Sequence, residues 1–131
     1  MVNIFTRYKT NTTTKKAVCW FERYNIPYQL IGLEDISEAH IKQILILSDG
    51  LDEILLSRDK GQKTWEKLHL NQQWFEEMSM NELMYILKKY PVLLKSLILF
   101  DHHRMLVGYN EEEIRIFLPV AYRRVYCKQV S

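Results

Sequence analysis

The sequence predicts an α/β domain with a helical insertion. Short strand-like segments lie near both ends of the chain, and a helical pattern separates the first two of them. A block of helical segments follows, and a hairpin and a final helix come after it. Because residues 1–33 have the order strand, helix, strand, we expect a right-handed βαβ crossover there. The length of 131 residues fits one domain.

The amino-terminal elements follow from the apolar spacing. Val2 to Thr6 is apolar and rich in β-branched and aromatic residues, which indicates a buried strand. Residues 7–14 form a polar loop that contains several helix N-cap formers, so a helix is expected next. Asn25-Ile26-Pro27 ends this helix, because proline disfavours helical geometry in the residue before it. Tyr28 to Leu33 is the second predicted strand. The apolar face of the helix comprises Ala17, Trp20, Phe21 and Tyr24.

The middle of the chain is predicted to be helical. Ser37 is placed to cap a helix whose apolar positions extend from Ile41 to Leu47, and Ser48-Asp49-Gly50 breaks it. The last helix of this block stops at Pro91. Three helices are expected after the first one, over Asp52 to Ser57, Lys63 to Leu68 and Asn81 to Tyr90.

Strand patterns return near the carboxyl end. Leu97 to Phe100 is a continuous apolar run, residues 101–104 form a polar turn, and Met105 to Val107 is a second strand. Asn110 is placed to cap a last helix, whose first turn carries three glutamates that suit the positive end of the helix dipole. Pro119 ends it. Its apolar face comprises Ile114, Phe117 and Leu118.

Charge and composition exclude several classes of function. The net charge is +2, from 18 basic and 16 acidic residues, which is too even to indicate a nucleic-acid-binding protein by itself. Both ends of the chain are basic, and this charge fits either a solvated surface or proximity to DNA or an acidic protein. No apolar run is long enough to span a membrane, and no signal peptide is recognised, so we expect a cytoplasmic protein.

Neither a metal site nor a cofactor site is expected. Cys19 and Cys127 are far apart and have no ligand spacing, which argues against zinc and against a disulfide framework. His102 and His103 are adjacent in a turn without a third ligand at useful spacing. Cys19 is expected to be a buried, inert thiol, with a nucleophile as the alternative. Cys127 lies near the carboxyl end and is expected to be incidental.

Three blocks of the sequence resemble one known family. The most specific block is LVGYNEEEIRIFLP, residues 106–119. The second is IKQIL at 41–45 followed by DGLDEI at 49–54, and the third is MVNIFT at 1–6 with KKA at 15–17 and Trp20. The chain thus resembles the Spx branch of the arsenate-reductase-like family. The resemblance implies a thioredoxin-like mixed four-stranded sheet with a helical insertion.

The resemblance also implies an organisation and a partner. A single domain would have its core in residues 1–33 and 97–119, a helical insert at 34–96 and a tail at 120–131. Spx proteins bind the carboxyl-terminal domain of the RNA polymerase α subunit, contact promoter DNA only within that complex, and act as monomers. Two alternatives remain, namely an oxidoreductase of the arsenate reductase group that uses Cys19 or Cys127, and an adaptor for another protein.

The thiol motif of the family is missing. Its CxxC lies between the first strand and the first helix, where the helix amino end favours a thiolate. Counting back from Lys15 places Asn11 and Thr14 at the two positions, whereas counting forward from the strand places Thr10 at the first. Amide and hydroxyl groups form neither a thiolate nor a disulfide. The sequence therefore predicts a protein without a redox switch at this motif, and arsenate reduction is not expected.

A second part of the family's thiol site also differs. Relatives carry arginine, proline and isoleucine before the third strand, and the peptide bond preceding the proline is cis. The matching residues here are Ser96-Leu97-Ile98, with Lys95 adjacent. A cis bond before a non-proline residue costs about 2.5–4 kcal/mol, against about 0.5–1 kcal/mol before proline. The Ser96–Leu97 bond is therefore expected to be trans.

The resemblance also points to candidate contacts with the partner. Gly50 matches a glycine on the polymerase-binding surface of Spx, and Asp49, Leu51 and Asp52 flank it. Glycine permits positive φ and close approach of another backbone, and the same residue suits a helix C-cap. Arg58 matches an arginine that approaches the redox loop, where it could hydrogen-bond Asn11, and a surface arginine is the alternative.

Overall fold

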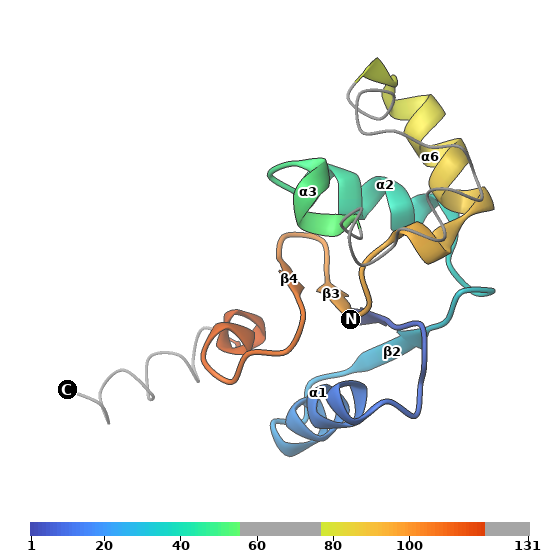
Figure 1. Ribbon diagram of the computed structural model, residues 1–131. Helices are drawn as coiled ribbons and strands as arrows, with labels where there is room; N and C mark the ends of the chain where they lie inside the picture. Colours follow the sequence, from blue (N-terminus) through green and yellow to red (C-terminus); the bar gives the residue numbers. More distant parts are fainter. Residues whose placement is uncertain (56–76, 120–131) are drawn as a thin grey trace.

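A mixed four-stranded sheet forms the centre of the computed structural model, which describes residues 1–55 and 77–119. The strand order is β2-β1-β3-β4 (Figure 1). Strands β1 and β2 are parallel, and both β1–β3 and β3–β4 are antiparallel. The strands are β1 (Val2–Phe5), β2 (Tyr28–Ile31), β3 (Ile98–Phe100) and β4 (Met105–Val107). The predicted α/β fold with a mixed four-stranded sheet is confirmed.

Helix α1 (Thr12–Arg23) connects the two parallel strands, as predicted. Its N-cap is Asn11, whose side chain accepts a hydrogen bond from the backbone of Thr13. The helical insert contributes the other described helices, and a short 3-10 segment lies near the carboxyl end. They are α2 (Glu38–Leu47), α3 (Leu51–Ile54), α6 (Met80–Lys89), η1 (Pro91–Leu93) and η2 (Glu113–Phe117).

A capping box begins α2. The Ser37 side chain accepts from the backbone N–H of His40, and His40 Nδ1 accepts from the backbone N–H of Ser37 at 3.1 Å. Burial, together with the nearby Lys88 ammonium, lowers the pKa of His40. A neutral imidazole is the form that leaves Nδ1 free to accept this bond.

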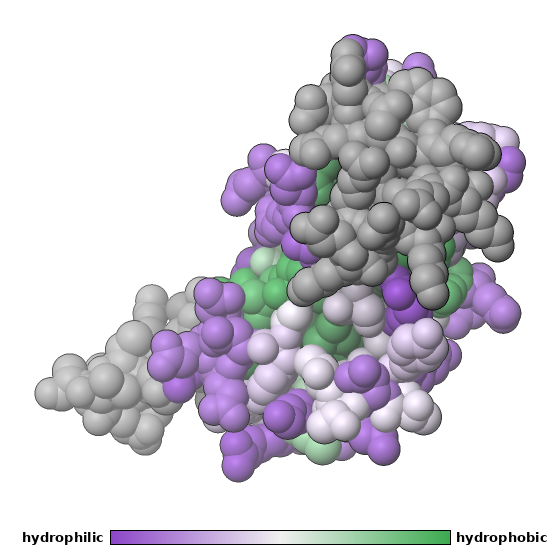
Figure 2. All heavy atoms as spheres, in the orientation of Figure 1, coloured by the Kyte–Doolittle hydropathy of each residue, from purple (hydrophilic) through white to green (hydrophobic). Residues whose placement is uncertain are grey.

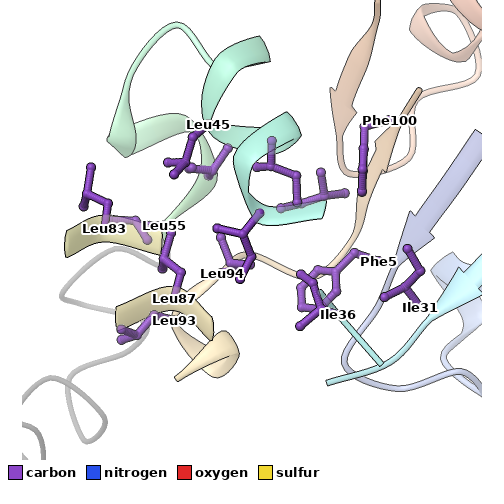
Figure 3. Close-up of a cluster of buried hydrophobic side chains, with 14 residues drawn as sticks. Phe5, Ile31, Ile36, Leu45, Leu55, Leu83, Leu87, Leu93, Leu94 and Phe100 are labelled. Carbon is purple, nitrogen blue, oxygen red and sulfur yellow. The ribbon is translucent and has the colours of Figure 1, made fainter. Parts of the chain in front are cut away.

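Each face of the sheet supports a separate hydrophobic cluster. Side chains alternate along a strand, so Ile4 and Phe5 point to opposite faces. Phe5, Ile31 and Phe100 pack with the leucines of the insert, as Figure 3 shows. Ile4 lies in the other cluster, which joins α1 to η2. Other buried members of this second cluster are Ala17, Phe21, Leu99, Ile114 and Phe117. One sheet thus holds the insert on one side and α1 with η2 on the other.

Some predicted helices differ from the observed ones. The last segment is a 3-10 helix over Glu113–Phe117, and the Asn110 side chain accepts the N–H groups of Glu112 and Glu113 at its start. The predicted burial of its apolar side chains is correct. Helix α3 starts at Leu51 and ends at Ile54. The predicted helix over 63–68 lies outside the described residues.

The Ser96–Leu97 peptide bond is cis, so the expectation of a trans bond was wrong. That expectation considered only the local preference of the residue type. In the fold, contacts from distant segments hold both residues: Ser96 Oγ accepts from the backbone N–H of Arg7 at 3.1 Å, and the Leu97 carbonyl accepts from Gly108 N at 2.7 Å. Tertiary contacts therefore determine the geometry here.

Candidate partner-binding site and the β1–α1 loop

The loop around Gly50 lies between α2 and α3. Helix α2 ends at Ser48, whose hydroxyl donates back to the Leu45 carbonyl at 2.9 Å. Gly50 is the N-cap residue of α3, so the predicted C-cap role was wrong. Its φ of 178° is extended backbone that any residue adopts, and positive φ is not needed. A Cβ at Gly50 would have no atom of the described residues within 4 Å.

The residues beside Gly50 form a surface that is partly acidic and partly apolar. Asp49 and Asp52 are exposed and Leu51 is half-buried. On the last turns of α2, the side chain of Ile46 is 58% exposed. We call Asp49 to Asp52 the Gly50 surface. Residues of this kind at the edge of a domain suit contact with another protein.

The β1–α1 loop contains the positions where the resemblance places thiols. Thr14 is 1% exposed, and its hydroxyl lies 2.8 Å from that of Thr6, which is also buried. Both hydroxyls also lie within hydrogen-bond distance of the Tyr8 carbonyl, at 3.1 Å from Thr6 and 3.4 Å from Thr14. Because each hydroxyl has one hydrogen, one of them donates to the other hydroxyl and the second donates to the carbonyl. Asn11 acts as the cap of α1, and Thr10 is exposed. Two hydroxyl groups and a carbonyl thus close the loop by hydrogen bonds, without sulfur.

Cys19 is exposed, so the expectation of a buried thiol was wrong. The buried side chains of α1 are Thr14, Ala17, Trp20 and Phe21, and Cys19 lies on the opposite side of the helix. It lines an open hollow of about 470 Å³ together with Lys16, Arg23 and Tyr109. Figure 2 shows that hydrophilic residues are common around the lower edge of the molecule, where α1 lies. Desolvation and the charge of Glu111 raise the pKa of Tyr109, against the effect of Arg23.

Other candidate groups form no site in the described part of the chain. Within residues 1–55 and 77–119, histidine, cysteine and carboxylate side chains gather nowhere in a group of three that could bind a metal. His102 and His103 are neighbours in the β3–β4 turn, with ring centroids 6.4 Å apart. None of the described helices has the length and apolar character to cross a membrane. Arg58 and Cys127 lie outside the described residues.

Sequence reasoning missed three residues of this region. Thr6 closes the loop with Thr14, Arg7 contacts the insert, and Ile46 extends the Gly50 surface. Ile46 could have been found, because it falls outside the three- and four-residue spacing of the buried positions of α2. The pairing of Thr6 with Thr14 has no sequence signal, since it depends on how β1 and α1 approach each other.

The fold and the loop together define a class of protein. It is a thioredoxin-like α/β domain with a helical insert, in which hydroxyl and amide side chains occupy the loop between the first strand and the first helix. The chain belongs to the ArsC family, whose model matches residues 7–117, and within it to the Spx branch.

Relatives in several bacteria support this assignment. The chain is 39% identical over 122 residues to the global transcriptional regulator Spx of Bacillus subtilis, covering 91% of this chain and 88% of the relative. It is 39% identical over 134 residues to Spx 1 of Oceanobacillus iheyensis, covering 100% and 97%. It is 34% identical over 121 residues to Spx of Streptococcus pneumoniae, covering 90% and 86%.

Solved structures support the fold. A protein from Staphylococcus aureus COL matches with a TM-score of 0.67 at 18% identity, over 88% of this chain and 97% of that one. An arsenate reductase from Vibrio cholerae matches with a TM-score of 0.57 at 13% identity, over 89% and 94%. At these identities the likeness concerns the fold, not the activity.

Proposed function

We propose that this protein is a cytoplasmic transcription regulator that binds the carboxyl-terminal domain of the RNA polymerase α subunit. The Gly50 surface makes the contact, and the protein acts as a monomer that reaches promoter DNA only within the polymerase complex. Its binding needs no thiol switch and no cofactor. The Spx relatives, named as global transcriptional regulators, support the regulatory class.

One observation carries the proposed contact. Gly50 is exposed, and no atom of residues 1–55 or 77–119 lies within 4 Å of the place where its Cβ would project. A partner backbone can therefore come close to this loop without displacing any side chain. The half-buried Leu51 and the exposed carboxylates beside it offer an apolar contact with a polar rim, as in ordinary protein interfaces.

Binding is expected to be the same in reducing and in oxidising buffer. The loop is held by the Thr6 and Thr14 hydroxyls, which dithiothreitol and diamide leave unchanged. Isothermal titration of the purified α carboxyl-terminal domain into the full chain measures the affinity in both buffers, and Cys19→Ser serves as a control for the exposed thiol. A tenfold or larger loss of affinity on reduction would contradict the thiol-independent mechanism, and no binding in either buffer would contradict the partner.

An oxidoreductase remains the second candidate, and the exposure of Cys19 favours it. The thiol is accessible, and the basic side chains of Lys16 and Arg23 line the same hollow, where an anionic substrate could lie beside it. If the protein is a regulator, the purified chain will show no turnover of a glutathione-linked disulfide or of arsenate above the Cys19→Ser background. Turnover that disappears in Cys19→Ser would establish the enzyme instead. An adaptor for a different protein would fail both assays.

A further inference from the structure

Arg7 lies at the point where the β1–α1 loop meets the helical insert. Its backbone is fixed on both sides. The N–H of Thr6 donates to the Ile31 carbonyl at 3.0 Å, and the Tyr8 carbonyl accepts from the Asn11 N–H and from one of the two threonine hydroxyls. The loop therefore leaves Arg7 little freedom of position.

The side chain of Arg7 reaches the segment before β3. One guanidinium nitrogen, Nη2, donates to the Val92 carbonyl at 2.7 Å and lies 3.5 Å from the Leu94 carbonyl. The first contact is a short charge-assisted hydrogen bond, which is stronger than a neutral one. The backbone N–H of Arg7 adds the bond to Ser96 Oγ. Three contacts thus connect one residue to the segment 92–96, more than 80 positions away in the chain.

The same segment also contacts helix α3, which begins directly after Gly50. The backbone N–H of Lys95 donates to the Ile54 carbonyl at 2.7 Å, and Lys95 Nζ donates to the Asp52 carbonyl at 3.0 Å. Leu94 and Leu55 form an antiparallel bridge beside them. Figure 1 shows the segment after α6 passing from the insert into β3.

Helix α3 depends on such support. It has only four residues, and a single turn is not stable by itself because helix nucleation is unfavourable. Its carbonyls at Asp52 and Ile54 are bonded to Lys95. The position of Gly50 at its start therefore follows the position of the 92–96 segment, which Arg7 holds.

We propose that Arg7 is a positioning residue that fixes the Gly50 surface through the 92–96 segment. Its role in partner binding rests on the proposed function, whereas its effect on the surface does not. The contacts form one continuous series from the hydroxyl-closed loop through Arg7 and Lys95 to α3. Spatial continuity alone is not evidence of coupling, so the test compares matched variants.

Hydrogen exchange of the free, full-length protein tests the positioning. Arg7→Met is expected to accelerate exchange of the Glu53 and Leu55 amides, which bond within α3, by about tenfold or more. Arg104→Met is the matched control, because Arg104 also donates to a backbone carbonyl, that of Ile116, but on the far side of the sheet. It should change exchange at these two amides by less than about twofold. Equal exchange in the two variants would overturn the proposal.

Two further variants keep the test decisive. Arg7→Lys retains a cation that can reach one carbonyl, and exchange between that of the wild type and that of Arg7→Met is expected. Lys95→Met breaks the next contact and should accelerate the same amides even if Arg7→Met folds poorly. Lys95→Met leaving these amides as protected as in the wild type, or Arg7→Lys exchanging as fast as Arg7→Met, would contradict the series of contacts.

Affinity for the α carboxyl-terminal domain is the second measurement. Arg7→Met is expected to weaken binding about tenfold at unchanged overall secondary structure, and Arg104→Met less than twofold. If the wild type does not bind, the proposed function fails, while the exchange result still decides the role of Arg7. If the wild type binds and Arg7→Met binds equally well, the positioning role in binding is wrong.

Discussion

Replacing Gly50 by arginine is expected to abolish detectable binding to the α carboxyl-terminal domain, with at least a 100-fold loss of affinity. An arginine is compatible with the local backbone, because the extended φ suits any residue and no atom in the described part of the chain lies within 4 Å of the new Cβ. Its long side chain then occupies the space that the partner backbone needs. A 100-fold loss corresponds to about 2.8 kcal/mol, which lies within the range of single changes at the centre of an interface.

Ala39→Arg is the matched control for Gly50→Arg. It adds the same charge at another exposed position, at the opposite end of α2. With a rise of about 1.5 Å per residue, the two sites are separated by most of the length of that helix. Fluorescence anisotropy measures both affinities, and circular dichroism checks both folds. Normal binding by a folded Gly50→Arg protein would show that the partner contacts another surface.

Strand and helix patterns predicted most of the fold because its faces are regular. The alternation of Ile4 and Phe5 places one side chain in each cluster, and the spacing of Ala17 and Phe21 fixes the inner face of α1. The η2 helix was harder to predict. Its segment lies between Gly108, which has a φ of 82°, and Pro119, and its apolar spacing and capping residue fit a short α-helix as well as the observed 3-10 helix.

The candidate site was predictable in position but not in geometry. The resemblance located Gly50, yet a glycine after a helix can end that helix or begin the next one. The Ser48 hydroxyl ends α2 first, which leaves Gly50 to begin α3. Whether Cys19 is buried or exposed depends on which side of α1 packs against the sheet. The sequence around Cys19 is compatible with both, and the structure shows that it is exposed. The exposure of Cys19 therefore follows from packing between distant segments, whereas the role of Gly50 follows from a local bond.

Loss of the thiol motif has a structural counterpart in the loop. Thr14 is buried at the amino end of α1 and finds a partner in Thr6 at the end of β1. Buried hydroxyls need such partners, since an unsatisfied one costs about 1–3 kcal/mol. The loop therefore keeps a defined shape without a disulfide. This supports the proposal that binding to the polymerase domain needs no thiol switch.

Phe21→Ala is expected to lower the free energy of unfolding by about 3–5 kcal/mol, the usual cost of removing a fully buried aromatic side chain. The Phe21 ring meets Trp20 edge-on at 5.2 Å between centroids and Phe117 at 5.7 Å, so it joins α1 to η2. Urea unfolding followed by circular dichroism measures the change.

Tyr85→Ala provides the comparison for Phe21→Ala, because its ring is 64% exposed on α6 and its loss should cost less than about 0.5 kcal/mol. Similar stabilities of the two variants would contradict the packing of α1 against η2. The Gly50 surface rests on the other cluster, which contains Ile54 and Leu55. The folded fraction of Phe21→Ala should therefore bind the α carboxyl-terminal domain with wild-type affinity, since the cluster that it disrupts lies across the sheet from the binding surface.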